Sequence, residues 1–351
     1  MMSEDGSAQR VPTRTRMFAE AEEAPRAIER QLRDNGEIMA DIARSLRRLS
    51  PRAVVTAARG SSDNAATYAK YLIETKMGIL TSSAAPSVSS VYTAQTDLKN
   101  VVFLAMSQSG RSPDLLATLE AAKRAGAFTV ALVNAENSPL AGLADAVVPL
   151  RAGPELSVAA TKSFVATNVA IAHLIAAWHE DDGLLAALNG LPDYLAQTWQ
   201  LDWSAAITRL KSARDLYVIG RGLGFGMAQE AALKLKETCA LHAEAFSAAE
   251  VLHGPMALVK DRFPVFVMSQ ADETRDGVNE LVGRLAENHA DVLLAGFSHP
   301  RATVLPTIAA NPVLEPILFI QSFYRMAEAL SRTRGLDPDS PPHLNKVTET
   351  V

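Results

Sequence analysis

The chain has 351 residues, of which 48% are hydrophobic and 21% are charged. This length predicts two globular units of roughly 150 residues each. The formal net charge of -5 leaves no basic surplus to neutralise a phosphate backbone, so nucleic acid is not expected as a partner. The longest apolar stretch, residues 164–178, is interrupted by polar residues and is too short for a membrane span, so no membrane association is expected.

The chain has one cysteine, Cys239. It excludes an internal disulfide and a Cys-x-x-Cys metal site, and neither a metal nor a cofactor is expected. No charged-then-apolar leader opens the chain, which favours a cytoplasmic location. Residues 1–13 are polar and are expected to form a frayed tail.

From residue 17 to residue 49, apolar positions recur with helical spacing and predict two amphipathic helices that break near Asn35 and Gly36. Short apolar runs follow, and turn residues and a helical pattern come after each of them. These runs are residues 53–58, 101–106, 129–133 and 146–149. The alternation predicts an α/β fold in which helices cover both faces of a parallel sheet.

An internal repeat divides the chain. Residues 53–72 align with residues 215–235, and residues 101–110 align with residues 264–273. The spacing from the first turn to the second is 47 positions in both copies, from Gly60 to Ser107 and from Gly222 to Ser269. Because the second copy lacks the small polar residues of the first, we expect a single ligand site, located mainly in the first copy.

The repeat suggests a division of the chain into five parts. They are an N-terminal tail with helices (1–49), a first domain (50–185), linker helices (186–209), a second domain (210–335) and a C-terminal tail (336–351).

Residues 107–113 read Ser-Gln-Ser-Gly-Arg-Ser-Pro, and they join a predicted strand to a predicted helix. Backbone N–H groups at a helix N-terminus, with serine hydroxyls beside them, can form an uncharged cradle for a phosphate. A tight turn whose serines only cap the helix is an equally good interpretation. Ser61 and Ser62 lie in a second such turn, which should lie beside the first if the two strands are neighbours.

Residues 220–226 are rich in glycine, follow a predicted strand and precede a helix. The Gly-x-Gly-x-x-Gly spacing of a dinucleotide loop fails because Phe225 stands where the third glycine is needed. A close approach of two backbone segments is therefore favoured over a nicotinamide site.

Glu230, Lys234 and Glu237 follow one another at i, i+4 and i+7 on the next helix. Such a stripe is usually solvated, yet His242 and His253 follow within two dozen residues, and these groups together can move protons at neutral pH. The composition of residues 334–351 is typical of a disordered tail that would include Lys346.

Four segments together resemble the isomerase half of glucosamine-6-phosphate synthase. They are SQSGRSPDLL (107–116), VAATKSF (158–164), ALKLKETCALHAEAFSAAEVLHGPMAL (232–258) and LNKVT (344–348). The resemblance extends from about Met17 over nearly the whole chain. It implies two tandem sugar isomerase (SIS) domains, each a flavodoxin-like three-layer α/β/α unit with a parallel sheet.

The resemblance also implies roles for individual residues. It implies that Glu237 transfers the proton, that His253 assists ring opening and that Lys346 forms a Schiff base. It further implies a substrate-binding set for a hexose or hexosamine 6-phosphate, comprising Ser61, Ser62, Ser107, Gln108, Ser109, Ser112, Val158 and Lys234. A homodimer, in which His253 reaches the site across the subunit boundary, is also implied.

The chain departs from the family's pattern in several places. It lacks the glutaminase half, so we expect that it does not by itself release ammonia from glutamine. Ala160 stands where the family has serine, and Arg111 stands where it has an acidic residue. The tail motif is one residue shorter after Lys346.

These observations favour an aminosugar-phosphate isomerase and deaminase that converts glucosamine 6-phosphate reversibly to fructose 6-phosphate and ammonia. One alternative is a deglycase that splits an amino-acid adduct of a phosphosugar. Another is a sugar-phosphate sensor without catalytic activity. The presence of Glu237, His253 and Lys346 favours an enzyme.

Overall fold

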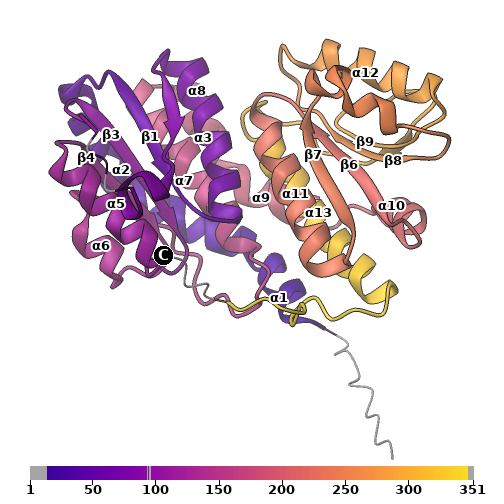
Figure 1. Ribbon diagram of the computed structural model, residues 1–351, viewed down its shortest axis with the longest axis horizontal. Helices are drawn as coiled ribbons and strands as arrows, with labels where there is room; N and C mark the ends of the chain where they lie inside the picture. Colours follow the sequence, from indigo (N-terminus) through magenta and orange to yellow (C-terminus); the bar gives the residue numbers. More distant parts are fainter. Residues whose placement is uncertain (1–13, 93, 95, 347–351) are drawn as a thin grey trace, which may run out of the picture.

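The computed structural model describes residues 14–92, 94 and 96–346. Two five-stranded parallel sheets, one in each half of the chain, lie in two lobes with helices around them (Figure 1). The first sheet has the order β2-β1-β3-β4-β5 and the second has the order β10-β9-β8-β6-β7. The expected α/β class, with a tandem pair of parallel sheets, is confirmed.

The strands have the following bounds: β1 Ala53–Ala57, β2 Thr81–Ser83, β3 Val101–Ser107, β4 Phe128–Val133, β5 Ala146–Pro149, β6 Asp215–Gly220, β7 His242–Ser247, β8 Pro264–Met268, β9 Asp291–Ala295 and β10 Thr303–Leu305. The central strand β3 is buried at every position. A parallel sheet that is covered on both faces requires such continuous apolar runs, which is why the strands were recognisable in the sequence.

The helices have the following bounds: α1 Arg16–Glu22, α2 Ala24–Leu49, α3 Ser61–Met77, α4 Pro86–Ser90, α5 Pro113–Arg124, α6 Pro139–Leu143, α7 Lys162–His179, α8 Asp182–Asn189, α9 Leu191–Thr198, α10 Ser204–Leu210, α11 Leu223–Cys239, α12 Arg275–Glu287 and α13 Glu315–Thr333, with the 3-10 helices η1 Glu250–His253 and η2 Pro255–Leu258. Helix α7, which contains the long apolar stretch, is buried along almost its whole length between α2 and α3. None of the described helices combines the length and the apolar character that crossing a membrane requires.

The two halves repeat one another in detail. Taken from its β7 edge, the second sheet has the same strand order as the first taken from its β2 edge. Gly60 precedes α3 with φ 56° and ψ -130°, and Gly222 precedes α11 with φ 57° and ψ -128°. Side chains rarely adopt this conformation, so the aligned glycines keep the same sharp strand-to-helix turn in both copies.

The glycine-rich run allows two close approaches. A Cβ atom on Gly226 would lie 2.5 Å from the backbone oxygen of Asn64, and one on Gly224 would lie 2.5 Å from Oε1 of Gln270. Helix α11 therefore packs directly against the backbone of α3 across the junction of the two lobes. The expected close backbone approach is confirmed.

The expected helix break near Asn35 and Gly36 is wrong, because α2 runs unbroken through both residues. Asn35 is fully buried, and its Nδ2 donates to the carbonyl oxygen of Pro149 at 2.7 Å. Its amide therefore bonds to a neighbouring segment and does not compete for the backbone of its own helix. The break lies instead at Glu23, where a proline in the first turn starts α2.

Candidate active site

Two turns meet at the carboxyl edge of the first sheet. Strands β1 and β3 pair in parallel, so the turn after β1 lies beside the turn after β3. An ion pair joins them, with the guanidinium of Arg59 2.7 Å from the buried carboxylate of Asp114. The expected adjacency of the two hydroxyl-rich turns is confirmed.

The two turns have several free hydrogen-bond donors. The Oγ atom of Ser107 accepts the N–H of Gly110 at 2.9 Å and folds the turn back on itself. Ser112 occupies the N-cap position of α5, but its side chain does not cap the helix. Within the described residues, the hydroxyls of Ser62, Ser109 and Ser112 and the N–H of Ser109 have no hydrogen-bond partner. Uncharged donors at a helix N-terminus are suited to binding an anion.

Gln108 is half-buried in the same turn, and its carbonyl oxygen accepts the N–H of Ala135 at 3.1 Å. Its backbone is therefore anchored to the loop after β4.

The matching turn of the second copy is closed by carboxylates. Asp272 stands at the position of Gly110, and its Oδ1 accepts the N–H of Thr274 at 2.9 Å. The Oε2 atom of Glu315 accepts the N–H of Ala271, which stands at the position of Ser109, at 2.6 Å. Because these donors already bind carboxylates, an incoming anion would be repelled. This asymmetry is a physical reason for a single anion site in the first copy.

A buried carboxylate on α11 gathers groups from both halves of the chain. Glu230 is fully buried, and it accepts hydrogen bonds from Ser61 Oγ at 3.1 Å and Asn64 Nδ2 at 2.9 Å, both on α3. The hydroxyl of Tyr324 on α13 donates to it at 3.1 Å. Glu230 therefore fixes Ser61, one of the predicted substrate-binding residues, relative to α11.

The ammonium group of Lys234 lies between two glutamates. Its Nζ is 3.5 Å from Oε1 of Glu230, and it also donates to Oε2 of Glu237. The side chain of Lys234 is 1% exposed, whereas that of Glu237 is 20% exposed. The expectation that the charged stripe on α11 faces solvent is wrong for Glu230 and Lys234, because α3 and α13 cover this face of the helix. Glu237 alone keeps an open side.

Burial and charge set the protonation of this cluster. Burial raises the pKa of Glu230 above its ordinary value, and Lys234 only partly opposes that shift. Burial favours the neutral amine of Lys234, but Glu230 and Glu237 outweigh it and raise its pKa. Lys234 is therefore an ammonium ion that orients the Glu237 carboxylate.

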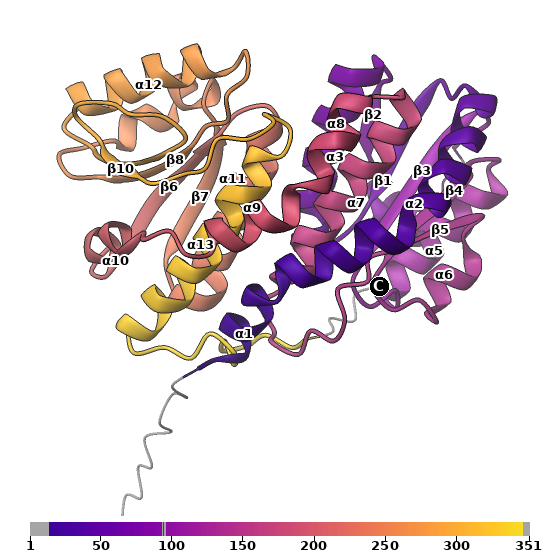
Figure 2. The same ribbon diagram turned by 180° about the vertical axis from the view of Figure 1, so that it is seen from behind.

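The C-terminal segment brings Lys346 to the first half of the chain. The described part of this segment runs from α13 past α1 (Figures 1 and 2). The Nζ atom of Lys346 donates to the carbonyl oxygen of Ser157 at 2.6 Å, in the loop that also carries the half-buried Val158. The interpretation of residues 334–351 as a disordered tail is therefore wrong for Lys346. Residues 347–351, which include the shortened end of the motif, lie outside the described residues.

His253 is not joined to this cluster. It ends η1 with an exposed side chain, and it makes no hydrogen bond or ion pair with any residue that the structure describes. The neighbouring apolar side chains Leu252 and Leu258 are 43% and 57% exposed.

Three residues were not anticipated as parts of a site. Asn64 and Tyr324 bind Glu230, and Glu155 lies 3.5 Å from Nζ of Lys346. Glu155 is a buried acid three residues before the Val-Ala-Ala-Thr-Lys segment, and that position was the available signal. For Asn64 and Tyr324 the sequence offered no signal, because they act through a partner on another helix.

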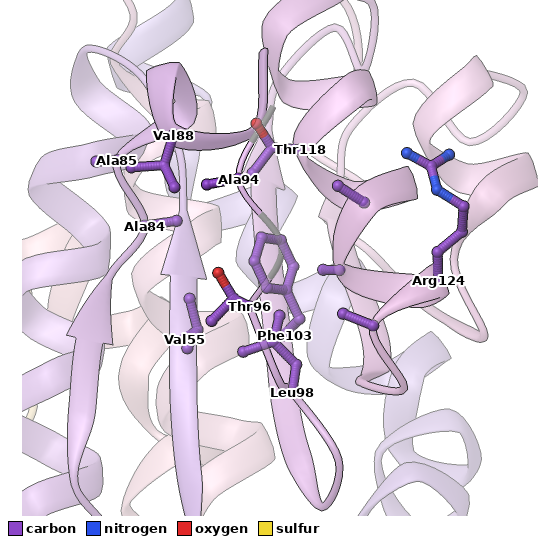
Figure 3. Close-up of a pocket in the computed structure, with 13 residues that line it drawn as sticks. Val55, Ala84, Ala85, Val88, Ala94, Thr96, Leu98, Phe103, Thr118 and Arg124 are labelled. Atoms are coloured by element: carbon purple, nitrogen blue, oxygen red, sulfur yellow. The ribbon is translucent and has the colours of Figure 1, made fainter. Parts of the chain in front are cut away.

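A cavity of about 600 Å³ lies elsewhere in the first domain, over β1 and β3 and beside α5 (Figure 3). Its lining is mainly apolar, with Val55, Val88, Leu98 and Phe103 among its residues, and it contains none of the predicted site residues. A second cavity, of about 420 Å³, lies between α11 and the C-terminal segment, and Glu237 lines it together with Leu336. The second cavity therefore adjoins the candidate site, whereas the first does not.

Comparison with known proteins places this arrangement in a class. The SIS domain family matches residues 49–177 and 209–295, so the chain belongs to the SIS-domain proteins and carries two such domains. The chain is 35% identical to the glutamine–fructose-6-phosphate aminotransferase of Aeropyrum pernix over 310 residues, and this match covers 83% of the chain. The chain spans about half (50%) of the length of that relative. The expected kinship with the isomerase half of that enzyme family is confirmed.

Solved structures agree with this placement. A protein from Silicibacter pomeroyi, assigned by its name to the phosphosugar isomerases, is 44% identical with a TM-score of 0.89, and the match covers 93% of this chain and 100% of the other. The C-terminal domain of the glucosamine-fructose-6-phosphate aminotransferase of Francisella tularensis is 25% identical with a TM-score of 0.84, and this match covers 97% and 100% of the two chains.

Proposed function

We propose that this protein is an aminosugar-phosphate isomerase and deaminase that converts glucosamine 6-phosphate to fructose 6-phosphate and ammonia, reversibly. The observation that carries the proposal is the pairing of Glu237, a partly open carboxylate, with the buried ammonium of Lys234. Such a pair holds a general base in one orientation next to a site that can take a sugar. The kinship with sugar-phosphate enzymes supports it.

The sugar phosphate binds at the carboxyl edge of the first sheet. The hydroxyls of Ser62, Ser109 and Ser112 and the N–H of Ser109 donate to the phosphate oxygens, because these donors have no partner among the described residues. Ser107 contributes by shaping the turn through Gly110. A phosphate held there is remote from C1 and C2 and serves mainly to bind the substrate.

Proton transfer between C1 and C2 is the task of Glu237. Lys234 donates to one oxygen of Glu237 and fixes its position, which leaves the other oxygen for the substrate. Glu230 in turn holds Lys234 from the buried side.

Lys346 handles the open-chain carbonyl. Its amine adds to the carbonyl carbon and water leaves, which forms an imine that polarises the neighbouring C–H bond. The amine adds to the carbonyl carbon in its neutral form, so its ammonium gives up a proton before that step.

A homodimer completes the site in this proposal. His253 is exposed and is flanked by the exposed Leu252 and Leu258, a combination that suits an interface. Across that interface His253 reaches the site of the partner subunit and assists ring opening.

The test is to incubate the purified protein with glucosamine 6-phosphate and galactosamine 6-phosphate and to assay ammonia and ketose phosphate together. We expect both products in equal amounts from the glucosamine compound. Binding without turnover would contradict the proposal and would favour a sugar-phosphate sensor.

One observation favours a second candidate function. The cavity of about 420 Å³ that adjoins Glu237 is larger than ammonia requires, and it has apolar walls at Leu336 and Leu344. A deglycase that releases an amino acid from a phosphosugar adduct would use such a space. Fructoselysine 6-phosphate, assayed for released lysine, separates the two candidates.

A further inference from the structure

The loop between β5 and α7 is held by a carboxylate that the chemistry described above does not use. Glu155 is buried, and its Oε1 accepts the N–H groups of Thr161 at 3.0 Å and Ser163 at 3.1 Å. Its Oε2 accepts the hydroxyl of Ser163 at 2.5 Å. These bonds fasten both ends of the segment that carries Val158 to the first turn of α7.

The same carboxylate faces the C-terminal segment. The Oε2 atom of Glu155 lies 3.5 Å from Nζ of Lys346, and the side chain of Glu155 is 0% exposed. Among the residues that the structure describes, Lys346 is the only cation within 4.0 Å of Glu155. The nearby Lys162 is paired with Glu23 instead, at 2.7 Å. A buried carboxylate without a counter-ion is unfavourable, so Glu155 favours the docked position of Lys346.

We propose that Glu155 is a positioning residue that fixes the 155–161 loop and the C-terminal lysine in one geometry. It acts through Lys346 and touches no reacting atom. The part of the inference that concerns turnover rests on the proposed role of Lys346 in imine formation. The claim that Glu155 holds Lys346 in its docked position rests only on the contacts described above.

The test compares Glu155→Gln with Glu20→Gln. The glutamine at 155 keeps an oxygen for the two N–H groups, but it presents no negative charge to Lys346. Glu20 is a matched control because its carboxylate is also buried, accepts the N–H of Ser157 in the same loop and makes no ion pair with Lys346. Both variants lose a buried charge, and only Glu155→Gln loses the ion pair with Lys346, while Ser157 keeps its carbonyl oxygen for the lysine in both.

Docking is measured by trypsin, which cleaves after Lys346 only when the lysine leaves its place. Intact mass spectrometry follows the loss of residues 347–351 from the native full chain. We expect cleavage to be about tenfold faster or more in Glu155→Gln and unchanged within about twofold in Glu20→Gln. Equal cleavage of wild type and Glu155→Gln would overturn the proposal, as would equal acceleration in both variants.

Turnover gives a second readout. With the preferred aminosugar phosphate, Glu155→Gln should lower kcat by about tenfold or more and change KM by less than about threefold, because the phosphate cradle is untouched. A raised KM with an unchanged kcat would overturn the positioning role. If Glu155→Gln does not fold, Glu155→Asp replaces it, since the shorter acid withdraws from Lys346. Cleavage and kcat equal to wild type in that variant would also overturn the proposal.

The two proposals fail in different ways. If borohydride traps no sugar on Lys346 in the wild type while Glu155→Gln still exposes Lys346 to trypsin, the imine role fails and the docking role stands. If sugar is trapped on Lys346 equally well in wild type and Glu155→Gln, and cleavage is also equal, the imine role stands and the positioning role fails.

Discussion

The Nζ atom of Lys234 lies 3.5 Å from Oε1 of Glu230, and neither side chain is more than 1% exposed. Glu230 also accepts hydrogen bonds from Ser61 and Asn64 on α3 and from Tyr324 on α13. A buried pair of this kind destabilises the fold strongly when one partner is removed, because the other charge remains buried alone.

Lys234→Met should therefore lower the free energy of unfolding by about 3–5 kcal/mol, as measured by urea denaturation. The loss should grow with pH. Burial already holds the pKa of Glu230 above its ordinary value of 4.5, and removing the ammonium raises it further. Above pH 4.5 the unfolded carboxyl ionises while the folded one resists, so folding loses stability as pH rises toward the folded pKa.

The double variant Glu230→Gln/Lys234→Met is the control for this prediction, since it removes both charges. Its free energy of unfolding should no longer show the fall with rising pH that Glu230 produces between pH 5 and 8. A deficit in Lys234→Met that is the same at pH 5 and pH 8 would contradict the assignment of the buried charge.

Gly226→Ala should separate the two lobes slightly and lower the free energy of unfolding by about 1–3 kcal/mol, because its Cβ would lie 2.5 Å from the backbone oxygen of Asn64. Gly283→Ala in α12 is the matched control, since a Cβ there meets nothing within 4 Å. It should be neutral or stabilise by up to about 1 kcal/mol. Thermal denaturation of both variants checks the contrast, and equal effects would refute the close-approach explanation.

Ser109→Ala should raise KM for the sugar phosphate about tenfold and change kcat by less than about threefold, since it removes a donor to a group remote from the reaction. Steady-state kinetics measure both constants. Ser269→Ala is the control, because Ser269 occupies the position of Ser107 in the second copy, where carboxylates close the turn. An unchanged KM in Ser109→Ala would remove the cradle from the proposal.

Glu237→Gln should abolish the exchange of solvent deuterium into C1 and C2 of bound sugar, because the amide keeps the shape of the side chain but cannot take a proton. NMR of the sugar follows the exchange, and circular dichroism checks the fold. Glu244→Gln, an exposed acid on β7, should exchange at the wild-type rate. Persistent exchange in Glu237→Gln would assign the base to another residue.

Mixing Glu237→Gln chains with His253→Ala chains tests the shared site. Each variant alone should be inactive, and a heterodimer should regain one intact site, with at most about half of the wild-type activity. Mass spectrometry first establishes that the chains exchange. If they exchange and no activity returns, His253 acts within its own chain.

Much of the architecture was predictable from the sequence because its signals are local. The continuous apolar runs follow from parallel strands that are buried on both faces, and the repeat is visible because Gly60 and Gly222 support the same turn. The adjacency of the two hydroxyl-rich turns follows from the pairing of β1 with β3. Catalytic roles for Glu237 and Lys346 were predicted from the family resemblance, because no pattern in the chain distinguishes these two residues from surface residues.

The tertiary structure alone decided which charges are buried. Helical periodicity describes one helix, but the environment of Glu230 depends on Ser61, which lies 169 residues earlier in the chain. For the same reason Asn35 sits inside a helix that the sequence predicted to break, because its amide bonds to Pro149 across 114 residues. The contact of Lys346 with Ser157 spans 189 residues. A buried polar group is stable only with its partner in place, and only the folded chain supplies the partner.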